Sequence, residues 1–473
     1  MRNPFLPKRL SICAILIFYT VFSGHLHAQE MLGTNAAYAA GYKAAFTCSA
    51  VFNGGKTLAQ ISAHELFGIY TEYQSLLDSL VEADIDYDRK RVSVAYGQSL
   101  PPRISVWRPH LGCVQLPPGA DTDVISRLPA IDIKKPRGDN NAPWQRIAPI
   151  NGSSGNEALD QVIKSAFRGG DFNPDFGENA FTSAILIATP KEIIAEHYLD
   201  GYTPQTSQRT WSVAKSIAAT VIGTAVKQGL IDVKKPAPIP AWQNPVDPRQ
   251  QITVENLLHM SSGLDSNRAG NRTDRLYLGG GSLVDTAVPN SLEQAPNSRW
   301  KYANYDTLLA MRSLREAIND DDAYLKFPFQ QLLYKIGMLD TYLETDWNGD
   351  FIMSSQVWTT SRDLARLGIL YLNNGSWNGE RILPENWASY VATPAPMQPA
   401  AGATGYGAQF WLYNERSPNI PNDTYAAHGN RGQYLMIIPS RNLLIVRRGY
   451  DPTGGRGFQM GKFAEAVLQA IEK

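Results

Sequence analysis

The chain of 473 residues and 52.2 kDa suits two domains, or one large domain with an extension, and is too long for one small domain. Hydrophobic residues make up 43% and charged residues 19%, which excludes a disordered tail. Lys plus Arg and Asp plus Glu both number 44, so the charge favours no nucleic-acid partner. The 3 cysteines form no CxxC pair and the 7 histidines lack ligand spacing, so we expect no metal and no cofactor.

Residues 1–28 have the three-part layout of a secretory signal peptide. A basic start is followed by a mostly apolar run over 10–22 and by the small residue Ala28 at a cleavage point. The apolar run is short for a membrane span, which needs about 20 residues, although an uncleaved anchor is the alternative. The sequence therefore predicts a secreted or periplasmic protein with no stable membrane span after cleavage.

Cleavage of this segment would leave Cys48 and Cys113 as the cysteines of the mature chain. In an oxidising compartment, two cysteines on one chain favour a disulfide. We predict that they pair and tie down the N-terminal part of the chain. Two buried free cysteines are the alternative.

Residues 29–150 are predicted to form an N-terminal extension of unknown role, ending in a Pro-, Gly- and Asn-rich connector. His64 and Glu65 resemble half of a zinc motif whose second His is missing, so we interpret them as part of a surface helix. We find no catalytic constellation in this extension. Its predicted elements are two helices and two short strands, at 35–46, 62–84, 91–96 and 103–107.

Residues 151–473 show a different pattern, with strands at both ends and a long, mainly helical stretch between them. The arrangement predicts an α/β (α+β) fold, in which an antiparallel sheet is flanked by helices and its first and last strands meet. A mainly helical insert and a final helix at 459–472 complete the prediction. The predicted strands are 181–188, 191–198, 434–438 and 443–447.

Ser212 and Lys215, in the run WSVAKS, open a predicted apolar helix over 212–228. Ser is an ordinary residue at a helix start, which would explain Ser212 without chemistry. Lys215, however, lies on the same helix face and is costly to bury unless it has a task. A desolvated lysine can be neutral and act as a base toward a nearby hydroxyl, while the helix start supplies N–H groups for an oxyanion. These two residues are therefore candidates for a nucleophile and its base.

The S-x-x-K pattern resembles the nucleophile motif of penicillin-binding proteins and serine β-lactamases. Tyr302-Ala303-Asn304, after a Trp two residues earlier, is similar to the Tyr-x-Asn motif of the class C branch, which includes esterases and aminohexanoate-oligomer hydrolases. The resemblance implies a β-lactamase/transpeptidase-like fold over 151–473, with Tyr302 as a further catalytic residue and Asn304 as a substrate-binding residue. We expect the Lys215 cation to lower the pKa of Tyr302.

A third motif, Lys-Thr-Gly or His-x-Gly in esterase-like members, is matched by His428 in AHGNRGQ. Asn430 stands where the family has Gly, which leaves the strand register open. The resemblance implies that His428 binds substrate or supports proton transfer. It also implies that the N–H of Arg431 is the second oxyanion donor, beside that of Ser212.

The sequence thus predicts a secreted serine hydrolase that cleaves a small-molecule ester or amide through an acyl-enzyme on Ser212. His428 in place of Lys resembles esterases and amide-oligomer hydrolases more than antibiotic β-lactamases. A β-lactamase, a D-amino-acid or cell-wall peptidase, and a non-catalytic binding module on the same fold are the alternatives. The α/β-hydrolase alternative is disfavoured because no G-x-S-x-G elbow occurs. Neither the oligomeric state nor a preference between ester and amide follows from the sequence.

Overall fold

The computed structural model describes residues 13–472 apart from residue 121 and the segments 168–175, 267–272, 414–418 and 455–456. In the first helix, α1 (Cys13–Phe52), side chains are described from residue 33 onward. The predicted signal peptide of residues 1–28 therefore lies outside the residues whose side chains are described. No helix within the described residues is long and apolar enough to cross a membrane.

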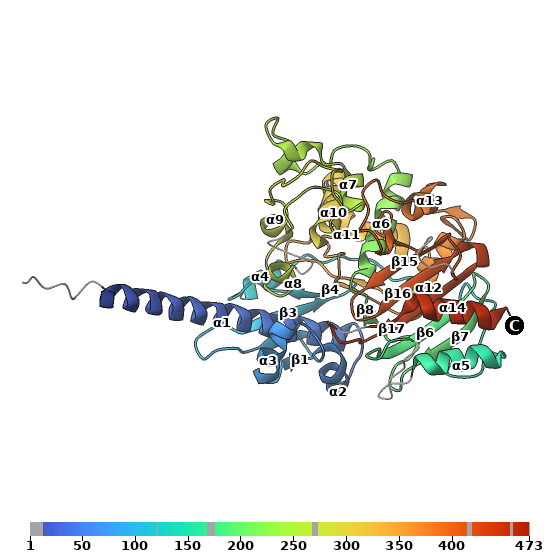
Figure 1. The fold of residues 1–473 in the computed structure, drawn as a ribbon, viewed down its shortest axis with the longest axis horizontal. Helices are drawn as coiled ribbons and strands as arrows, with labels where there is room; N and C mark the ends of the chain where they lie inside the picture. Colours follow the sequence, from blue (N-terminus) through green and yellow to red (C-terminus); the bar gives the residue numbers. More distant parts are fainter. Residues whose placement is uncertain are drawn as a thin grey trace, which may run out of the picture.

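The central element of the described chain is an eight-stranded sheet (Figure 1). In it, the strand that follows the His428 motif pairs with a strand that precedes Ser212 in the sequence. β17 lies antiparallel to β6, so the predicted meeting of the first and last long strands is confirmed. The sheet is antiparallel as predicted, except that the short edge strand β5 runs parallel to β7. In spatial order its strands are β13 (Gly405–Tyr406), β14 (Trp411–Tyr413), β15 (Thr424–Gly429), β16 (Gln433–Ile438), β17 (Leu443–Gly449), β6 (Thr182–Ala188), β7 (Glu192–Tyr198) and β5 (Arg146–Ile147).

Alternate residues of the central strands face two different hydrophobic layers. In β17, Leu444 and Val446 join a large core, while Leu443 and Ile445 join a smaller one. The smaller layer is formed with α5 (Glu157–Ala166) and α14 (Met460–Ile471), which lie side by side in Figure 1. The large layer is formed with α6 (Val213–Lys227) and α12 (Ser361–Leu372), so the helix that opens at Ser212 is buried.

The segment between β7 and β13 is mainly helical, as predicted, and contributes many residues to the large core; most of its helices lie above the eight-stranded sheet in Figure 1. It includes a three-stranded sheet of β8 (Gln208–Arg209), β10 (Val357–Thr359) and β9 (Tyr342–Leu343), and a ribbon of β11 (Ser376–Trp377) and β12 (Glu380–Arg381). Its other helices are α7 (Val254–Leu258), α8 (Asp274–Tyr277), α9 (Leu283–Thr286), α10 (Asn304–Ile318), α11 (Asp321–Pro328) and α13 (Trp387–Ala392).

The N-terminal unit shares the large core of the rest of the chain and adds three small hydrophobic clusters of its own. Tyr42 and Phe46 of α1 belong to the same hydrophobic core as Val213 of α6. Cys48 and Cys113 are joined by a disulfide that links α1 to β4. The elements of this unit after α1 are α2 (Leu58–Gln60), α3 (Thr71–Ser79), α4 (Thr122–Ser126) and an antiparallel sheet of β1 (Asp84–Asp86), β2 (Arg91–Val94), β3 (Arg103–Arg108) and β4 (Gly112–Gln115).

The single helix predicted over 62–84 is wrong. The chain forms one wide helical turn over Ile61–Glu65, breaks, forms α3 and enters β1. Gly68 has φ +67°, a left-handed conformation that ends the turn. Glu65 is only 1% exposed and forms an ion pair with Lys56, so the interpretation of His64 and Glu65 as a surface helix is also wrong.

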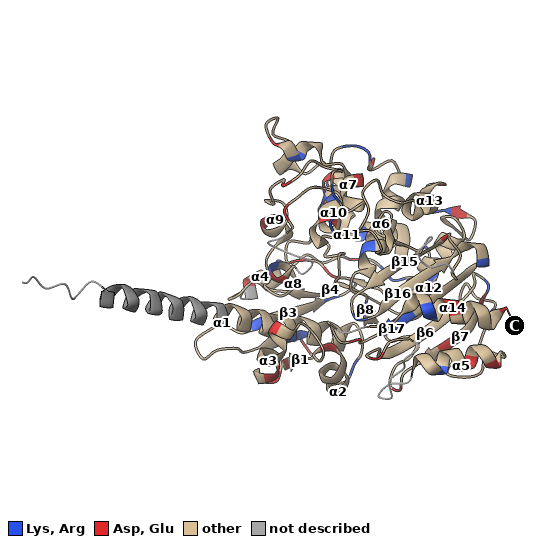
Figure 2. Cartoon of the chain, viewed as in Figure 1, with Lys and Arg blue, Asp and Glu red and all other residues tan. Residues whose placement is uncertain are grey.

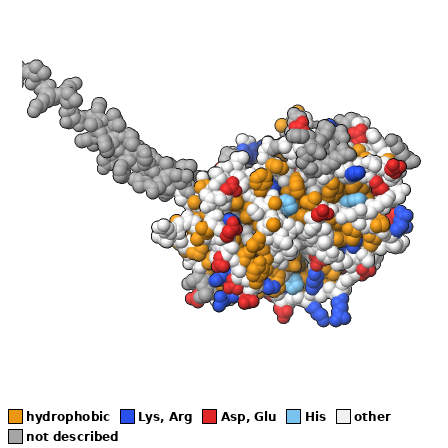
Figure 3. Space-filling view, turned by 90° about the horizontal axis from the view of Figure 1, so that it is seen from below, with side chains coloured by type: hydrophobic (Ala, Val, Ile, Leu, Met, Phe, Trp, Pro, Cys, Tyr) orange, Lys and Arg blue, Asp and Glu red, His pale blue; other side chains and the backbone are white. Residues whose placement is uncertain are grey.

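Charged residues of both signs are interspersed along the described elements, as Figure 2 shows. On the face seen in Figure 3, hydrophobic side chains lie between polar and charged ones. In the N-terminal unit several large hydrophobic side chains remain more than half exposed: Leu58, Phe67, Val81 and Tyr87.

Candidate active site

Ser212 lies where the chain turns from β8 into α6. Trp211, the residue before it, has φ 50°, in the left-handed region that bulky side chains rarely adopt. Ser212 occupies the N-cap position, yet its side chain makes no capping hydrogen bond. The ordinary structural role of a serine at a helix start therefore does not account for this hydroxyl.

Lys215, one turn into α6, is 1% exposed and directs its Nζ atom toward Ser212. Nζ lies 3.1 Å from Ser212 Oγ, 2.7 Å from Asn304 Oδ1 and 2.8 Å from the Ser354 carbonyl oxygen. Burial lowers the pKa of Lys215 well below its ordinary value. The amine is therefore biased toward its neutral form.

The two carbonyl acceptors decide how a neutral Lys215 is oriented. A neutral amine has two N–H groups and one lone pair, and the oxygens of Asn304 and Ser354 can only accept hydrogen bonds. Both N–H groups are used by these acceptors, so the lone pair faces Ser212 Oγ. This is the geometry of a general base that removes the serine proton.

Tyr302 and Asn304 approach Ser212 and Lys215 from the start of α10. Nζ of Lys215 lies 4.9 Å from the centre of the Tyr302 ring, over its face. Burial raises the pKa of Tyr302, and a hydrogen bond with Ser212 only partly opposes this effect. The expectation that Lys215 lowers this pKa is wrong, because desolvation of the phenol is the largest effect and raises its pKa. Tyr302 is thus a neutral phenol that can donate a proton.

His428 and Gly429 lie at the end of β15, where the strand edge is open. β14 ends opposite Ala426, so the residues after it extend past their neighbour on that side. A Cβ at Gly429 would lie 2.3 Å from the Thr210 carbonyl oxygen, so only glycine permits this approach to the segment before Ser212. The strand end is in this way held beside the serine.

His428 is a neutral side chain in this setting. Burial lowers its pKa to about 3, and its Nε2 atom lies 2.9 Å from the Tyr413 hydroxyl. Trp411 stacks on the imidazole with ring centres 5.6 Å apart and an angle of 16° between the planes. His428 can therefore offer a hydrogen bond to a substrate, but no positive charge at neutral pH.

Arg431 is placed differently from the expectation. Its backbone N–H donates to Asn430 Oδ1 at 2.9 Å, so this group is engaged by a side chain and does not stand free for an oxyanion. Its guanidinium points away from the serine and donates to the carbonyl oxygens of His64 and Phe67, each at 2.7 Å. The predicted role of Arg431 as oxyanion donor does not agree with this geometry.

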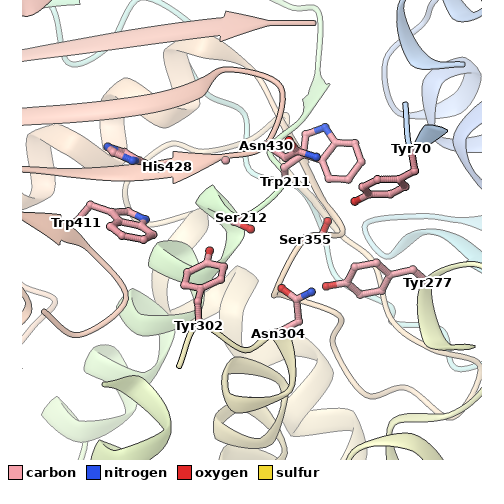
Figure 4. A pocket seen from close by; sticks show the side chains of 11 residues that line it. Tyr70, Trp211, Ser212, Tyr277, Tyr302, Asn304, Ser355, Trp411, His428 and Asn430 are labelled. Carbon is pink, nitrogen blue, oxygen red and sulfur yellow. The ribbon is translucent and has the colours of Figure 1, made fainter. Parts of the chain in front are cut away.

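These residues surround a cavity of about 350 Å³. Figure 4 shows Ser212 at its centre, with Trp411 and His428 on one side and Tyr70, Trp211 and Tyr277 on the other. Among the described residues that line the cavity, none is Asp, Glu, Lys or Arg. The lining residues are Tyr70, Trp211, Ser212, Tyr277, Tyr302, Asn304, Ser355, Trp411, His428, Gly429 and Asn430.

The structure thus brings together Ser212, Lys215, Tyr302, Asn304 and His428, leaving Arg431 outside the cavity. Sequence reasoning missed the aromatic walls and Ser355. Trp211 could have been found from its place beside the serine, but Tyr70 carries no local signal. No group of three or more His, Cys, Asp or Glu among the described residues could hold a metal ion.

A family model described as "Beta-lactamase" matches residues 178–447, which contain the five residues gathered around the serine. A 6-aminohexanoate-dimer hydrolase of Paenarthrobacter ureafaciens is 24% identical over 300 residues, covering 57% of this chain and 73% of the relative.

Two solved structures share the fold at lower identity. A penicillin-binding protein homologue from Caulobacter crescentus has a TM-score of 0.51 and 12% identity, covering 67% of this chain and 96% of the other. A family VIII carboxylesterase has a TM-score of 0.51 and 13% identity, with coverages of 67% and 97%. Tyr70 and the rest of the N-terminal unit precede the matched family region.

Proposed function

The chain belongs to the β-lactamase family and is a serine hydrolase, and we propose that it cleaves an uncharged ester or amide through an acyl-enzyme on Ser212. The observation that carries this proposal is the arrangement around Lys215. A buried neutral amine whose two N–H groups are occupied by carbonyl oxygens directs its lone pair at the Ser212 hydroxyl.

In the first half of the reaction, Lys215 removes the proton of Ser212 as Oγ attacks the substrate carbonyl carbon. The oxyanion is stabilised by the backbone N–H of Ser212 at the start of α6. We assign the second donor to the open strand edge at Asn430, which lines the cavity, in place of the Arg431 N–H.

Tyr302 acts in the collapse of the tetrahedral intermediate. As a neutral phenol in contact with Ser212, it donates its proton to the leaving oxygen or nitrogen. The proton held by Lys215 then restores the phenol. A water molecule attacks the acyl-enzyme with the same groups in reversed roles, releasing the acid and free Ser212.

The substrate is inferred from the charge of the cavity. No ion pair is offered to a carboxylate or an ammonium by the described lining, and His428 is neutral. These features favour an uncharged ester over a β-lactam antibiotic or a short linear amide with charged ends. The similarity to a 6-aminohexanoate-dimer hydrolase keeps an amide as the second candidate.

We further propose that the protein works in an oxidising compartment, secreted or periplasmic. The disulfide between Cys48 and Cys113 supports this location, because such bonds persist where glutathione and thioredoxin do not reduce them. No partner other than a small-molecule substrate is proposed.

The test is a fluorophosphonate probe followed by intact-mass measurement, with Ser212→Ala alongside. We expect one adduct on the wild type and none on the variant. An unlabelled, folded wild type would contradict an activated serine and favour a binding module on this fold.

A substrate panel then separates the candidates. Hydrolysis of a p-nitrophenyl ester, a 6-aminohexanoate dimer and a chromogenic cephalosporin is compared on the same enzyme. We expect the ester to be turned over fastest, whereas a preference for the cephalosporin would contradict the argument from cavity charge.

A further inference from the structure

The side chain of Ser355 is held by a buried arginine that the proposed reaction does not use. Nη2 of Arg209 donates to Ser355 Oγ at 2.8 Å, and Ser355 is 3% exposed at the cavity wall. Within the described part of the chain, this is the hydrogen bond that the Ser355 hydroxyl makes, and in it the oxygen accepts. Its own O–H group is therefore available to donate elsewhere.

Arg209 is buried without a carboxylate within ion-pair distance among the described residues. Its guanidinium contacts two neighbouring aromatic rings, 4.0 Å from the centre of the Phe46 ring and 3.9 Å from that of Trp211. Its Nε and Nη1 atoms have no hydrogen-bond partner among the described residues. Among the described residues its side-chain hydrogen bond is the one to Ser355, and the carboxyl group of Glu344 lies near enough to interact with its charge.

A hydroxyl that accepts from a cation becomes a stronger donor and a weaker acceptor, because hydrogen bonds in a chain polarise one another. In Figure 4, Ser355 lies on the same side of Ser212 as Tyr70, Trp211 and Tyr277. A substrate group in this half of the cavity would meet three aromatic rings and one polarised donor.

We propose that Ser355 is a substrate-binding residue that donates a hydrogen bond to an acceptor oxygen of the substrate, with Arg209 as its positioning residue. The substrate is inferred to carry, on one side of the cleaved bond, an uncharged aromatic or cyclic group bearing a carbonyl oxygen. This inference rests on the proposed function, because it concerns the same cavity.

The N-terminal unit contributes to this half of the cavity in two ways. Tyr70 forms part of its wall and meets Trp211 edge-on, with ring centres 6.3 Å apart. Phe46 of α1 packs against both the guanidinium of Arg209 and the ring of Trp211. Residues outside the matched family region therefore help to form the part of the cavity that we propose binds the substrate.

The test uses two boronic acids, which form reversible adducts with an activated serine and carry a single arm. 3-Acetylphenylboronic acid and 3-ethylphenylboronic acid have arms of similar shape, but only the first has an acceptor oxygen. Dissociation constants are measured by calorimetry on the full protein, on Ser355→Ala, on Arg209→Lys and on Ser389→Ala. Ser389 is exposed and remote from the cavity lining, so its variant is the matched control.

We expect the wild type to bind the acetyl compound about tenfold more tightly than Ser355→Ala does, which corresponds to one hydrogen bond. The ethyl compound should bind the wild type and Ser355→Ala with the same affinity. Comparing the two proteins with each compound removes the effect of any difference in reactivity between the two boron atoms. Arg209→Lys should reduce the acetyl preference, and Ser389→Ala should leave it unchanged.

An acetyl preference of equal size on the wild type and on Ser355→Ala would overturn the inference while leaving the proposed function intact. Failure of both compounds to bind a folded wild type would overturn the proposed function, and the inference with it. Because Arg209→Lys removes a stacked side chain, Ser355→Thr is the additional variant: it keeps the hydroxyl and should retain the preference.

Discussion

Nζ of Lys215 donates to Oδ1 of Asn304 over 2.7 Å, a hydrogen bond that joins two motifs separated by 89 residues. The bond fixes one N–H of the amine and leaves the direction of the lone pair to the remaining contacts. In the proposed mechanism, the reactivity of Ser212 depends on the protonation state of Lys215. Because residue 304 is in direct contact with Nζ, its charge influences the pKa of Lys215.

Asn304→Asp should shift the pH dependence of the reaction. A carboxylate beside Nζ favours the ammonium form and raises the pKa of Lys215, by about one unit or more for an opposite charge at this distance. Because the rate requires neutral Lys215, it rises as pH rises through this pKa. The acid limb of kcat/KM should therefore move to higher pH by about the same amount.

The uncharged control for this shift is Asn304→Ala, which removes the acceptor without adding a charge. Its acid limb should not move upward, even where its rate falls. If the acid limb of kcat/KM lies at the same pH in Asn304→Asp and in the wild type, Lys215 is not the base.

Tyr302→Phe should affect substrates according to their leaving group. The ring face above Lys215 is retained, but the proton donor is lost. Good leaving groups such as p-nitrophenolate need little protonation, so their rate should fall less than about tenfold, whereas an alkyl ester should lose about 10²–10⁴-fold. The ratio of the two kcat/KM values is the measurement, and equal losses would contradict the role as acid.

His428→Gln should leave the acid limb where it is. The pKa of His428 is lowered to about 3, so the imidazole is neutral throughout the range in which the limb falls. Glutamine keeps a polar group that can contact Tyr413, and we expect a moderate rise in KM for substrates bound at this side. Disappearance of the limb in this variant would assign it to His428 instead of Lys215.

Local spacing pointed to Ser212 and Lys215, and the family resemblance added Tyr302, but neither predicted the whole cavity. Ser212 and Lys215 are one helical turn apart, so their proximity follows from the helix alone. Tyr70 reaches the cavity only because the N-terminal unit packs on the large core, a contact with no local pattern. The predicted helix that should have contained it fails at Gly68, where φ is +67°.

The strand end beside the serine shows a second limit. The motif at His428 was found because its residue types resemble a known pattern, but hydrogen bonding near a turn depends on individual side chains. The side-chain oxygen of Asn430 accepts a hydrogen bond from the Arg431 N–H, and residue spacing does not predict this contact. The side chain of Arg431, for which no role was predicted, binds carbonyl oxygens of the N-terminal unit.

Removal of the disulfide should destabilise the protein without touching the cavity. Cys48 and Cys113 are 65 residues apart, and closing a loop of this length lowers the entropy of the unfolded chain by an amount worth about 4 kcal/mol. Cys48→Ala with Cys113→Ala should lower the free energy of unfolding by about that amount, as measured by urea titration. A reductant should lower the stability of the wild type and leave that of the double variant unchanged.

Arg431→Gln should loosen the attachment of the segment that leads to Tyr70. The guanidinium donates to the carbonyl oxygens of His64 and Phe67, and its loss leaves these acceptors without a donor. The expected cost is about 1–3 kcal/mol in the free energy of unfolding. Arg441→Gln is the matched control, since that arginine forms an ion pair with Glu472 in which both side chains are about half exposed, and its loss should cost less than about 1 kcal/mol. Equal effects of the two substitutions on urea unfolding would show that Arg431 does not anchor the N-terminal unit.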